Sequence, residues 1–547
     1  MERIKVYINN QEITIDKGTT LQELSVNYQD NFKYDIILAK VNGEHTELSH
    51  VVKENENIEF FDLYEREANR VYLNGLIFII DYTFKKIFNG NIKVKHSLDK
   101  GLYIGTDIKI DNDKLLKLEL EVNRLVESNR PIEKLTVPRS NAFNYYKKVN
   151  KTEKYENLKY NTNSYLTMYK LDTHYDYLYS HMPTSTGVLK YFKFNLINEN
   201  GFVLTFPTIY MTDSIKAYEH REHVFNMFKE SFEWSKRLGI NYINDLNKIV
   251  SSGKINDLIL TEEMEKNSKI LNAASQIIEK GNIKIVLIAG PSSSGKTTTT
   301  NKLCLALRSR GRNPKMISMD DFFKNREDTP LDEFGNKDYE SIDALDLDLF
   351  NEKISDLLSL KETIMPEYNF ITGEKEFKKT MKLEENDILL IEGIHAMNPK
   401  LLNNIPKENK IKIYLSALND LNIDRSVRIS TTDNRLLRRI VRDNRTRGHT
   451  VNHTLEAWAK VRNGEEKYIF PYQDMADITI NTALTYEIGV LKVYVEPLLY
   501  SVDISSPYYD EAKRLLNFLR LFLPIPSESI PNDSILREFV GGGCFKI

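Results

Sequence analysis

The sequence predicts a multidomain chain with α/β and α+β parts, whose C-terminal half is a doubly wound parallel sheet. Residues 290–297 read Gly-Pro-Ser-Ser-Ser-Gly-Lys-Thr, between an apolar run at 283–289 and a helical pattern at 298–307. Beyond this loop, strand and helix patterns alternate, which is typical of parallel sheets covered by helices. The 547 residues are too many for one core and suggest about three or four domains.

The loop at 290–297 is a phosphate-binding motif. Its glycines let the backbone turn tightly and direct N–H groups toward phosphate oxygens, at the positive end of the following helix. Lys296 is placed to reach the β- and γ-phosphates, and the Thr297 hydroxyl to ligate Mg²⁺. The strand before the loop and the helix after it argue against a chance match. We therefore expect ATP to contact Gly290, Ser292, Ser293, Ser294, Gly295, Lys296, Thr297 and Thr298.

Acidic residues end two of the predicted strands. Active sites of parallel sheets lie at the carboxyl ends of the strands, so these side chains are candidates for the site. Asp320 follows the strand at 315–319, where a carboxylate can accept the proton of an attacking hydroxyl; taken alone, it could equally cap a helix. Glu392 follows the buried run at 387–391, a position from which an acid holds Mg²⁺ directly or through water.

An arginine-rich segment follows at 435–448. Helical spacing places Arg435, Arg438, Arg439 and Arg442 on one face. Guanidinium groups on a mobile lid would neutralise a transferring phosphoryl group. The alternatives are a face that binds RNA phosphates and a face that is simply solvated. The phosphate loop in the same domain favours the lid.

Residues 1–63 have the pattern of a small β-rich module. Alternating residues at 4–8 and 12–15 predict a hairpin, and a short helix and further strands follow. Through the segments 39–44 and 52–59, this unit resembles the TGS domain, a β-grasp module found in threonyl-tRNA synthetases and some regulatory nucleotide enzymes. The resemblance implies a fold and no particular partner.

Residues 64–225 resemble the second domain of threonyl-tRNA synthetases, an α+β domain. The segments 84–88, 94–97 and 101–103 carry this resemblance. In that family an H-x-x-x-H helix helps to edit mischarged tRNA. The corresponding helix here, at 72–84, contains no histidine, so only the fold is carried over.

The rest of the chain divides into three parts. The helical pattern at 226–280 predicts a connector, a P-loop kinase-like domain is expected at 281–490, and residues 491–547 form a C-terminal extension. The extension ends in a glycine-rich segment that fits either a flexible tail or an intersubunit contact. Both a monomer and a homo-oligomer therefore stay open.

Bulk composition narrows the class of protein. A formal net charge of −3 argues against a surface that binds nucleic acid as a whole, although local basic patches stay open. Two distant cysteines fit a reducing compartment. The N-terminal residues lack the apolar core of a signal peptide, and no apolar run approaches the length of a membrane span. We expect a cytoplasmic protein with no membrane partner.

The C-terminal half resembles the uridine kinase and phosphoribulokinase family. The resemblance implies that Asp320 is the base that activates an acceptor hydroxyl, and that Tyr368 and Phe370 line a nucleoside pocket. It also implies that Arg439, Arg442 and Arg447 approach phosphate or sugar, with Arg442 acting in catalysis. Seven collinear elements carry the match: Gly290 to Thr297, 320–323, 343–346, 366–370, 391–394, the arginine run ending at Gly448, and 476–478.

Three positions depart from this family. Uridine kinases tend to carry an aspartate, a histidine and an arginine where this chain has Glu340, Gly373 and His449. Glu340 keeps an acceptor for ribose hydroxyls at a longer reach, so it stays an expected substrate contact. Gly373 removes a hydrogen-bonding side chain, which could relax or change the choice of base.

These expectations point to an ATP-dependent kinase that phosphorylates the 5′-hydroxyl of a nucleoside. The whole arrangement also resembles a bacterial family of long nucleoside kinases. Two other functions remain: a nucleotide-gated RNA-binding or regulatory protein, and a kinase of another small metabolite such as a sugar phosphate. In a combined form, RNA or a small ligand regulates the kinase through the N-terminal half.

Overall fold

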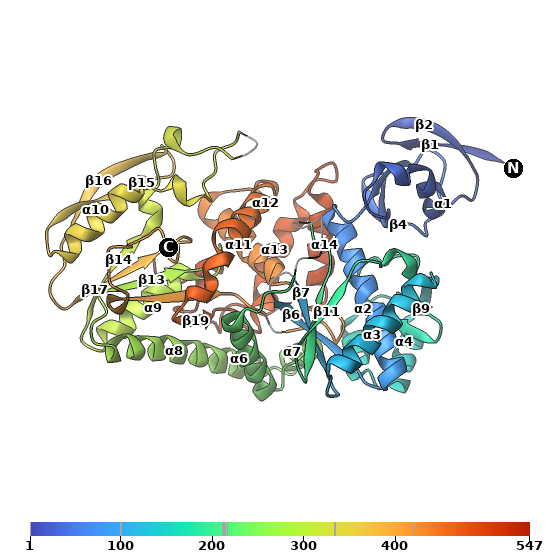
Figure 1. Cartoon of the computed structure of the whole chain (residues 1–547), viewed down its shortest axis with the longest axis horizontal. Coiled ribbons are helices and arrows are strands. Elements are labelled where there is room, and N and C mark those ends of the chain that lie inside the picture. The colour runs from blue at the N-terminus through green and yellow to red at the C-terminus, as the bar shows by residue number, and fades with distance from the viewer. Residues whose placement is uncertain are drawn as a thin grey trace. The chain divides into compact units, whose positions relative to one another are not determined.

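The computed structural model divides the chain into two compact units, and each is described by itself (Figure 1). The first unit comprises Met1–Arg221, Asn241–Asn244 and Leu421–Arg428, and the second comprises Glu222–Ile240, Asp245–Asp420 and Ile429–Ile547. The finer division into five domains stays a prediction. The residues that the structure describes are 2–98, 101–209, 215, 217–332, 335–419 and 421–546.

The N-terminal sheet contains the predicted hairpin. β1 (Arg3–Ile8) and β2 (Gln11–Asp16) pair antiparallel, with Val6 opposite Ile13. Thr20 and Glu23 form a capping box that begins α1 (Leu21–Ser25). The strand order is β2-β1-β5-β3-β4, with β3 (Leu38–Val41), β4 (Glu44–Glu47) and β5 (Asn57–Phe61). The likeness to the TGS module stays a prediction.

The rest of the first unit combines two sheets with long helices. The apolar face of α2 (Arg66–Phe88) packs in one core with α3 (Asn112–Glu127) and with inward-facing strand residues. One sheet has the order β11-β12-β7-β6, with β6 (Ile92–Leu98), β7 (Gly101–Thr106), β11 (Lys193–Asn198) and β12 (Gly201–Thr205). The other has the order β10-β9-β8, with β8 (Glu133–Pro138), β9 (Tyr165–Leu171) and β10 (His174–Asp176); α4 (Arg139–Lys148) and α5 (Thr152–Asn157) lie between β8 and β9 in sequence.

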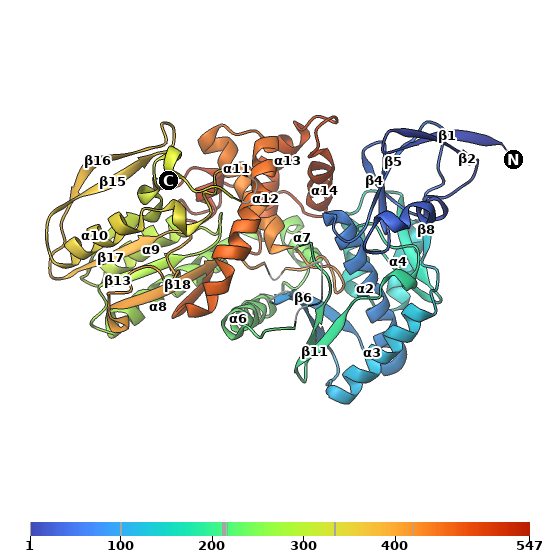
Figure 2. The ribbon, with the colours of Figure 1, turned by 45° about the horizontal axis from the view of Figure 1, so that its top comes forward.

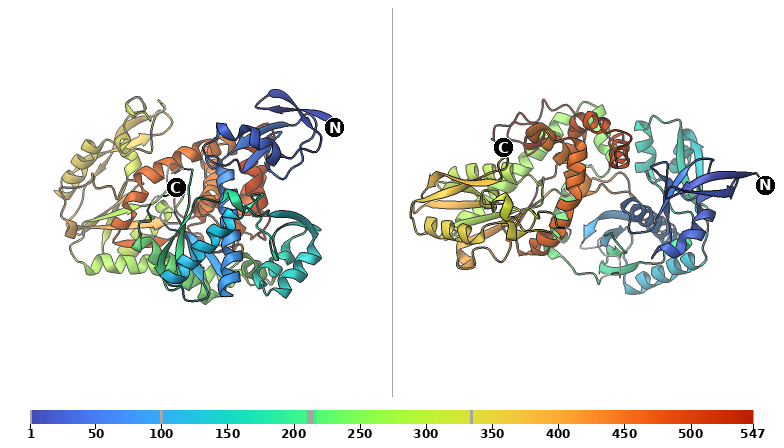
Figure 3. Two further views of the ribbon diagram at one scale, coloured as in Figure 1. Left: turned by 45° about the vertical axis from the view of Figure 1, so that its right-hand side comes forward. Right: turned by 90° about the horizontal axis from the view of Figure 1, so that it is seen from above.

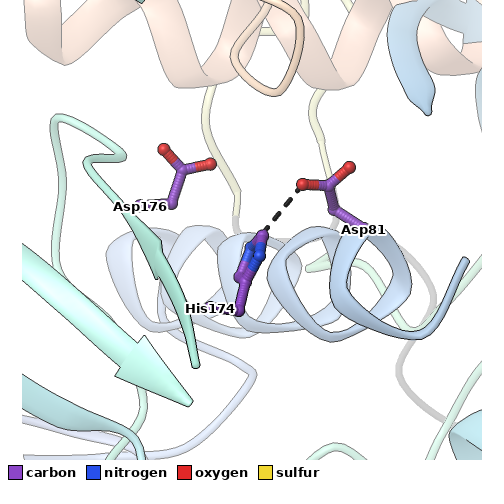
Figure 4. Close-up of side chains that lie close together, drawn as sticks. All are labelled: Asp81, His174 and Asp176. Carbon is purple, nitrogen blue, oxygen red and sulfur yellow. Dashed lines mark ion pairs between the residues drawn. The ribbon is translucent and has the colours of Figure 1, made fainter. Parts of the chain in front are cut away.

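A buried charge cluster lies between α2 and β10. Asp81, His174 and Asp176 point toward one another, and the His174 Nε2 atom is 3.6 Å from Asp81 (Figure 4). Their spacing could suit a metal ion. However, the Lys151 ammonium lies 3.2 Å from both carboxylates and already supplies the compensating charge. Burial lowers the pKa of His174 to about 4, so this ring is neutral.

The segment Leu421–Arg428, which interrupts the second unit in sequence, is held within the first unit. The Lys154 ammonium bridges Asp176 at 2.7 Å and Asp424 at 2.9 Å, and all three side chains are buried. Asn422 donates to the carbonyl of Val94 at 2.6 Å. These contacts hold Leu421–Arg428 in the first unit. In sequence, the arginine-rich helix of the second unit follows soon after this segment.

The second unit is built on the predicted parallel sheet. Its order is β14-β17-β13-β18-β19, with β13 (Ile285–Ala289), β14 (Asn313–Ser318), β17 (Asp387–Glu392), β18 (Lys410–Ser416) and β19 (Ile478–Asn481), and every neighbouring pair is parallel. α8 (Ile255–Glu279) and α9 (Lys296–Arg308) cover one face, and α10 (Leu347–Leu358) covers the other (Figure 1). Alternate residues of each strand therefore face opposite helical layers.

The remaining elements surround this sheet. α6 (Glu222–Leu238), α7 (Ile243–Ser251) and α8 account for the helical pattern predicted at 226–280. β15 (Thr363–Asn369) and β16 (Glu374–Met381) form an antiparallel hairpin. In Figure 2, α11 (Thr431–Arg447) lies beside α12 (Val451–Tyr468) and α13 (Glu487–Tyr500); α14 (Tyr509–Leu519) and α15 (Arg537–Val540) complete the unit.

Two further observations concern the cysteines and the apolar helices. Cys304, which is buried, and Cys544, which is exposed, are both free thiols. Within the described ranges, no helix is both long enough and apolar enough to cross a membrane.

Replacing Lys154 by methionine is expected to destabilise the first unit by about 3–5 kcal/mol, because Asp424 would stay buried without its cation and Asp176 would keep only Lys151. Thermal unfolding of the full chain measures the loss. The control is Lys159→Met, which breaks an exposed ion pair with Glu156 and should change stability by less than about 1 kcal/mol. Equal effects of the two substitutions would contradict this account of the cluster.

Candidate active site

The phosphate loop connects β13 to α9 and has the geometry of an anion cradle. Ser293 and Gly295 have φ angles of +60° and +81°, which turn the backbone sharply before the helix begins at Lys296. A Cβ atom on Gly290 would lie 2.5 Å from the carbonyl oxygen of Leu415, so only glycine fits there. The hydroxyls of Ser293 and Ser294 are buried and find no hydrogen-bond partner among the described residues. These features fit a bound phosphate.

Lys296 points back over the loop. Its ammonium donates to the carbonyls of Gly290 at 3.0 Å and Pro291 at 3.2 Å. Desolvation lowers the pKa of Lys296, while the nearby carboxylates of Glu392 and Asp320 oppose that shift. The loop lysine and both strand-end acids therefore lie close enough for their charges to interact.

The two strand-end acids lie on neighbouring strands. Ser318 on β14 pairs in register with Glu392 on β17, and Asp320 follows two residues later. The Asp320 backbone N–H is bonded to the Ser318 hydroxyl at 3.3 Å, so the side chain of Ser318, rather than that of Asp320, caps this turn. The Asp320 carboxylate is left exposed at the strand end. A helix-capping role for Asp320 is not observed.

Desolvation makes these acids weak. It raises the pKa of Glu392 to about 7, against the attraction of Lys296. The protein around the strand end partly desolvates the Asp320 carboxylate and so raises its pKa as well, while Lys296, Arg447 and Arg442 oppose this shift. A proton-accepting group with a raised pKa, close to cations, is suited to general-base chemistry. Glu392 and the half-buried Thr297 hydroxyl are the groups that could hold Mg²⁺.

The prediction that four arginines form one lid face is wrong for Arg435 and Arg438. Both are buried within the unit, where they form ion pairs with Glu465 and Glu487 respectively. Arg435 Nε donates to the carbonyl of Ser292 at 2.9 Å. Arg438 Nη1 donates to that of Ser293 at 3.3 Å. These guanidinium groups hold the back of the phosphate loop and are not available to a substrate.

Three other arginines of α11, Arg439, Arg442 and Arg447, lie around the front of the loop. Arg439 donates to the Ser292 hydroxyl at 2.8 Å. The buried carboxylate of Asp443 binds Arg439 and Arg447, each at 3.0 Å, and so positions both guanidinium groups. Arg442 lies 3.5 Å from the carboxylate of Glu538. α11 is packed into the second unit through four buried apolar residues: Leu436, Leu437, Ile440 and Val441.

Aromatic side chains form a second compartment beside Asp320. The ring centroids of Tyr368 and Phe370, from the β15–β16 hairpin, are 5.0 Å apart, and the rings meet edge to face at 75°. Phe323 joins Tyr368 at 5.7 Å and Tyr339 at 6.3 Å. Phe370 is 61% exposed, so part of its ring is accessible to a flat ligand. The Tyr368 backbone is hydrogen-bonded to Asp321, which ties this cluster to the strand end.

The structure explains two of the three positions at which this chain differs from the uridine kinase pattern. Glu340 packs against Gly464 of α12, where a Cβ atom would lie 2.4 Å from the Glu340 Cβ, and desolvation raises the pKa of Glu340 to about 7. Gly373, with φ +79°, forms the β15–β16 turn. A Cβ atom on Gly373 would lie 2.7 Å from the Arg326 guanidinium. The Arg326 side chain therefore occupies the space that a side chain at position 373 would need. His449 lies beside His453 and is half-buried.

Several residues of the site were not among the site residues predicted from the sequence. Phe323 and Tyr339 add to the aromatic compartment, and Arg326 adds a cation. Glu465 accepts a hydrogen bond from the Ser292 backbone N–H at 3.0 Å, and Glu538 contacts the start of α9. Only Phe323 carried a signal, because it stands in the Asp-Asp-Phe-Phe element.

The parallel sheet, the phosphate loop and the strand-end acids define a P-loop kinase-like domain. Residues 285–488 match the model of the Phosphoribulokinase / Uridine kinase family. This region is therefore a domain of that family. The match supports the function of a kinase that acts on a nucleoside or another small metabolite. The N-terminal half lies outside the match.

Similar proteins carry the same description. Uridine kinases of Staphylococcus aureus strains JH9 and Newman are each 29% identical over 197 residues, which cover 36% of this chain and 86% of each relative. A solved structure described as a possible uridine kinase from Bacillus stearothermophilus has 17% identity and a TM-score of 0.30. It covers 40% of this chain and 100% of that chain.

The raised pKa of Glu392 predicts a pH-dependent stability. Below pH 4.5, the ordinary pKa of this group, the carboxyl is protonated in both the folded and unfolded states. Between pH 4.5 and about 7 only the folded state keeps the proton, so stability falls as pH rises and levels off above pH 7. Glu392→Gln should therefore raise the thermal midpoint more at pH 8 than at pH 5, by roughly 2 kcal/mol of stability.

Glu408→Gln is the control for this measurement, because Glu408 is an exposed glutamate of the same unit. It should give the same small change at both pH values. A Glu392→Gln effect that does not depend on pH would contradict the desolvation of Glu392.

Proposed function

We propose that this chain transfers the γ-phosphate of ATP to the 5′-hydroxyl of a nucleoside. The observation that carries this proposal is the proximity of three parts: a phosphate loop, a carboxylate with a raised pKa at Asp320, and an aromatic compartment next to it. The loop suits the donor, and the aromatic compartment suits a planar acceptor. Asp320 lies at the strand end between them.

On the donor side, the loop amides and Lys296 bind the phosphates. Lys296 leaves its carbonyl partners, Gly290 and Pro291, when phosphate oxygens become available. Arg439, Arg442 and Arg447 balance the charge that moves during transfer, because α11 holds them at the mouth of the loop. Mg²⁺, when held by Thr297 and Glu392, would neutralise phosphate charge during the transfer.

On the acceptor side, Asp320 takes the proton of the attacking hydroxyl. Its raised pKa makes it a stronger base than an ordinary aspartate, while the charges of Lys296, Arg447 and Arg442 favour its ionised form. Tyr368 and Phe370 hold the base of the nucleoside, and Glu340 accepts from ribose hydroxyls. The charges of Arg439 and Asp320 act on Glu340, which supports its position at the same site.

A second acceptor class has one observation in its favour. The Arg326 guanidinium fills the space beside Gly373 and lies near Tyr368, where its charge affects the pKa of that phenol. A cation at this point suits an acceptor that already carries a phosphate or another anion. A phosphorylated small metabolite is therefore the alternative substrate.

Incubation of the full chain with ATP, Mg²⁺ and a panel of ribonucleosides, deoxyribonucleosides and sugar phosphates tests the proposal. Mass spectrometry should find the monophosphate of one or a few nucleosides. A product only from a sugar phosphate would support the alternative acceptor. No product from any acceptor, with ATP bound, would refute the kinase and favour the nucleotide-gated RNA-binding function, for which salt-sensitive tRNA binding is the next measurement.

Asp320→Asn should lower turnover by at least about a hundredfold and leave ATP binding within about twofold, because the amide cannot accept the hydroxyl proton. Steady-state kinetics and calorimetric titration with ATP measure the two effects. Asp321→Asn is the matched control, since Asp321 is the adjacent carboxylate and bonds the Tyr368 backbone instead. Near-normal turnover in Asp320→Asn, or a larger loss in Asp321→Asn, would rule out Asp320 as the base.

A further inference from the structure

The C-terminal segment belongs to the second unit, and Figure 3 marks the end of the chain. The sequence alone fitted either a flexible tail or an intersubunit contact at this segment. In the structure, Glu538, Phe539 and Val540 of α15 are buried against their own unit. The Ile535 side chain packs on the phosphate loop, 2.7 Å from where a Cβ of Gly295 would stand.

The Glu538 carboxylate binds the start of α9. Its Oε2 atom accepts from the Thr298 hydroxyl at 2.9 Å and from the Thr298 backbone N–H at 3.3 Å. That N–H belongs to the first turn of the helix, where backbone donors have no intrahelical partner and bind anions. A carboxylate from residue 538 therefore occupies a donor that the phosphate-binding motif provides for a phosphate oxygen.

The other carboxylate oxygen of Glu538 faces Arg442, one of the arginines beside the phosphate loop. The Glu538 Oε1 atom lies 3.5 Å from Arg442, whose guanidinium is half-buried. The same carboxylate acts on the charges of Lys296 and Glu392. Glu538 thus has the surroundings of a bound phosphate: a helix N-terminus, a threonine hydroxyl and an arginine.

The segment is held there by contacts that do not involve the phosphate donors. Arg445 donates to the carbonyls of Phe539 at 3.0 Å and Glu538 at 2.9 Å. Lys302 forms a 3.0 Å ion pair with Asp533. Gly541 and Gly542 have φ angles of +86° and +72°, so the glycine-rich end turns the chain directly after α15.

We propose that the C-terminal segment 533–543 is an internal ligand of the phosphate loop, and that the Glu538 carboxylate must leave Thr298 for a nucleoside triphosphate to bind. The inference rests on the proposed use of ATP. One anion excludes the other, since a carboxylate and a phosphate at the same N–H group would repel each other. The segment therefore sets the affinity for the nucleotide and confines phosphoryl transfer to molecules in which it is displaced.

Calorimetric titration of the full chain with ATP and Mg²⁺ tests this proposal. Glu538→Gln removes the competing charge at constant shape and should lower the Kd for ATP about tenfold, as expected for the loss of one charge-assisted contact. Glu528→Gln, an exposed glutamate of the same extension, is the matched control and should leave the Kd within twofold. An unchanged or higher Kd in Glu538→Gln would overturn the proposal.

Hydrogen exchange of the parent protein decides the question even where Glu538→Gln does not fold. Saturating ATP should speed amide exchange in 533–543 while it slows exchange in 290–300. Unchanged or slower exchange in 533–543 would overturn the proposal.

These outcomes separate the two inferences. Tighter ATP binding by Glu538→Gln, without any phosphorylated acceptor, supports the internal ligand and refutes the kinase. A nucleoside product from the parent, with an unchanged Kd in the variant, refutes the internal ligand alone. Failure of both proteins to bind ATP refutes both.

Discussion

The phosphate loop depends on two buried guanidinium groups behind it. A loop that directs its N–H groups toward an anion turns its carbonyl groups toward the protein, where each needs a donor. Arg435 and Arg438 supply these donors to Ser292 and Ser293, and Glu465 and Glu487 supply the opposite charges. In a buried setting, removal of either member of a pair leaves an uncompensated charge. The shape of the loop is therefore set by α11, α12 and α13 as much as by its own glycines.

This network explains which parts of the site could be predicted. The loop, Asp320 and Glu392 follow from local rules, since a motif and two strand ends fix their places in a parallel sheet. The arginines share a helical face by spacing, but spacing does not say what that face packs against. Arg435 and Arg438 became structural because buried acids on other helices face them. Such partners are determined only by the tertiary fold.

Long-range placement limited prediction elsewhere as well. Glu538 lies 240 residues from Thr298 in sequence, and no local pattern relates the two. In the N-terminal half, the hairpin and the first helix followed their patterns of alternation and capping. His174 carried no such signal, yet it packs against α2, the helix that contains no histidine of its own. The predicted likeness of this half to synthetase modules therefore says little about its chemistry.

The path of the chain through Leu421–Arg428 has a practical consequence. Residues on either side of this segment belong to the phosphate-binding unit, whereas Asp424 is buried against Lys154 of the other unit. A fragment that begins near residue 281 would keep the segment and lose its partners, so the Asp424 carboxylate would be left without Lys154. No single cut in the sequence yields the kinase-like part intact. For dissection of this protein, a fragment that carries the kinase-like part would need residues 421–428 redesigned as a loop.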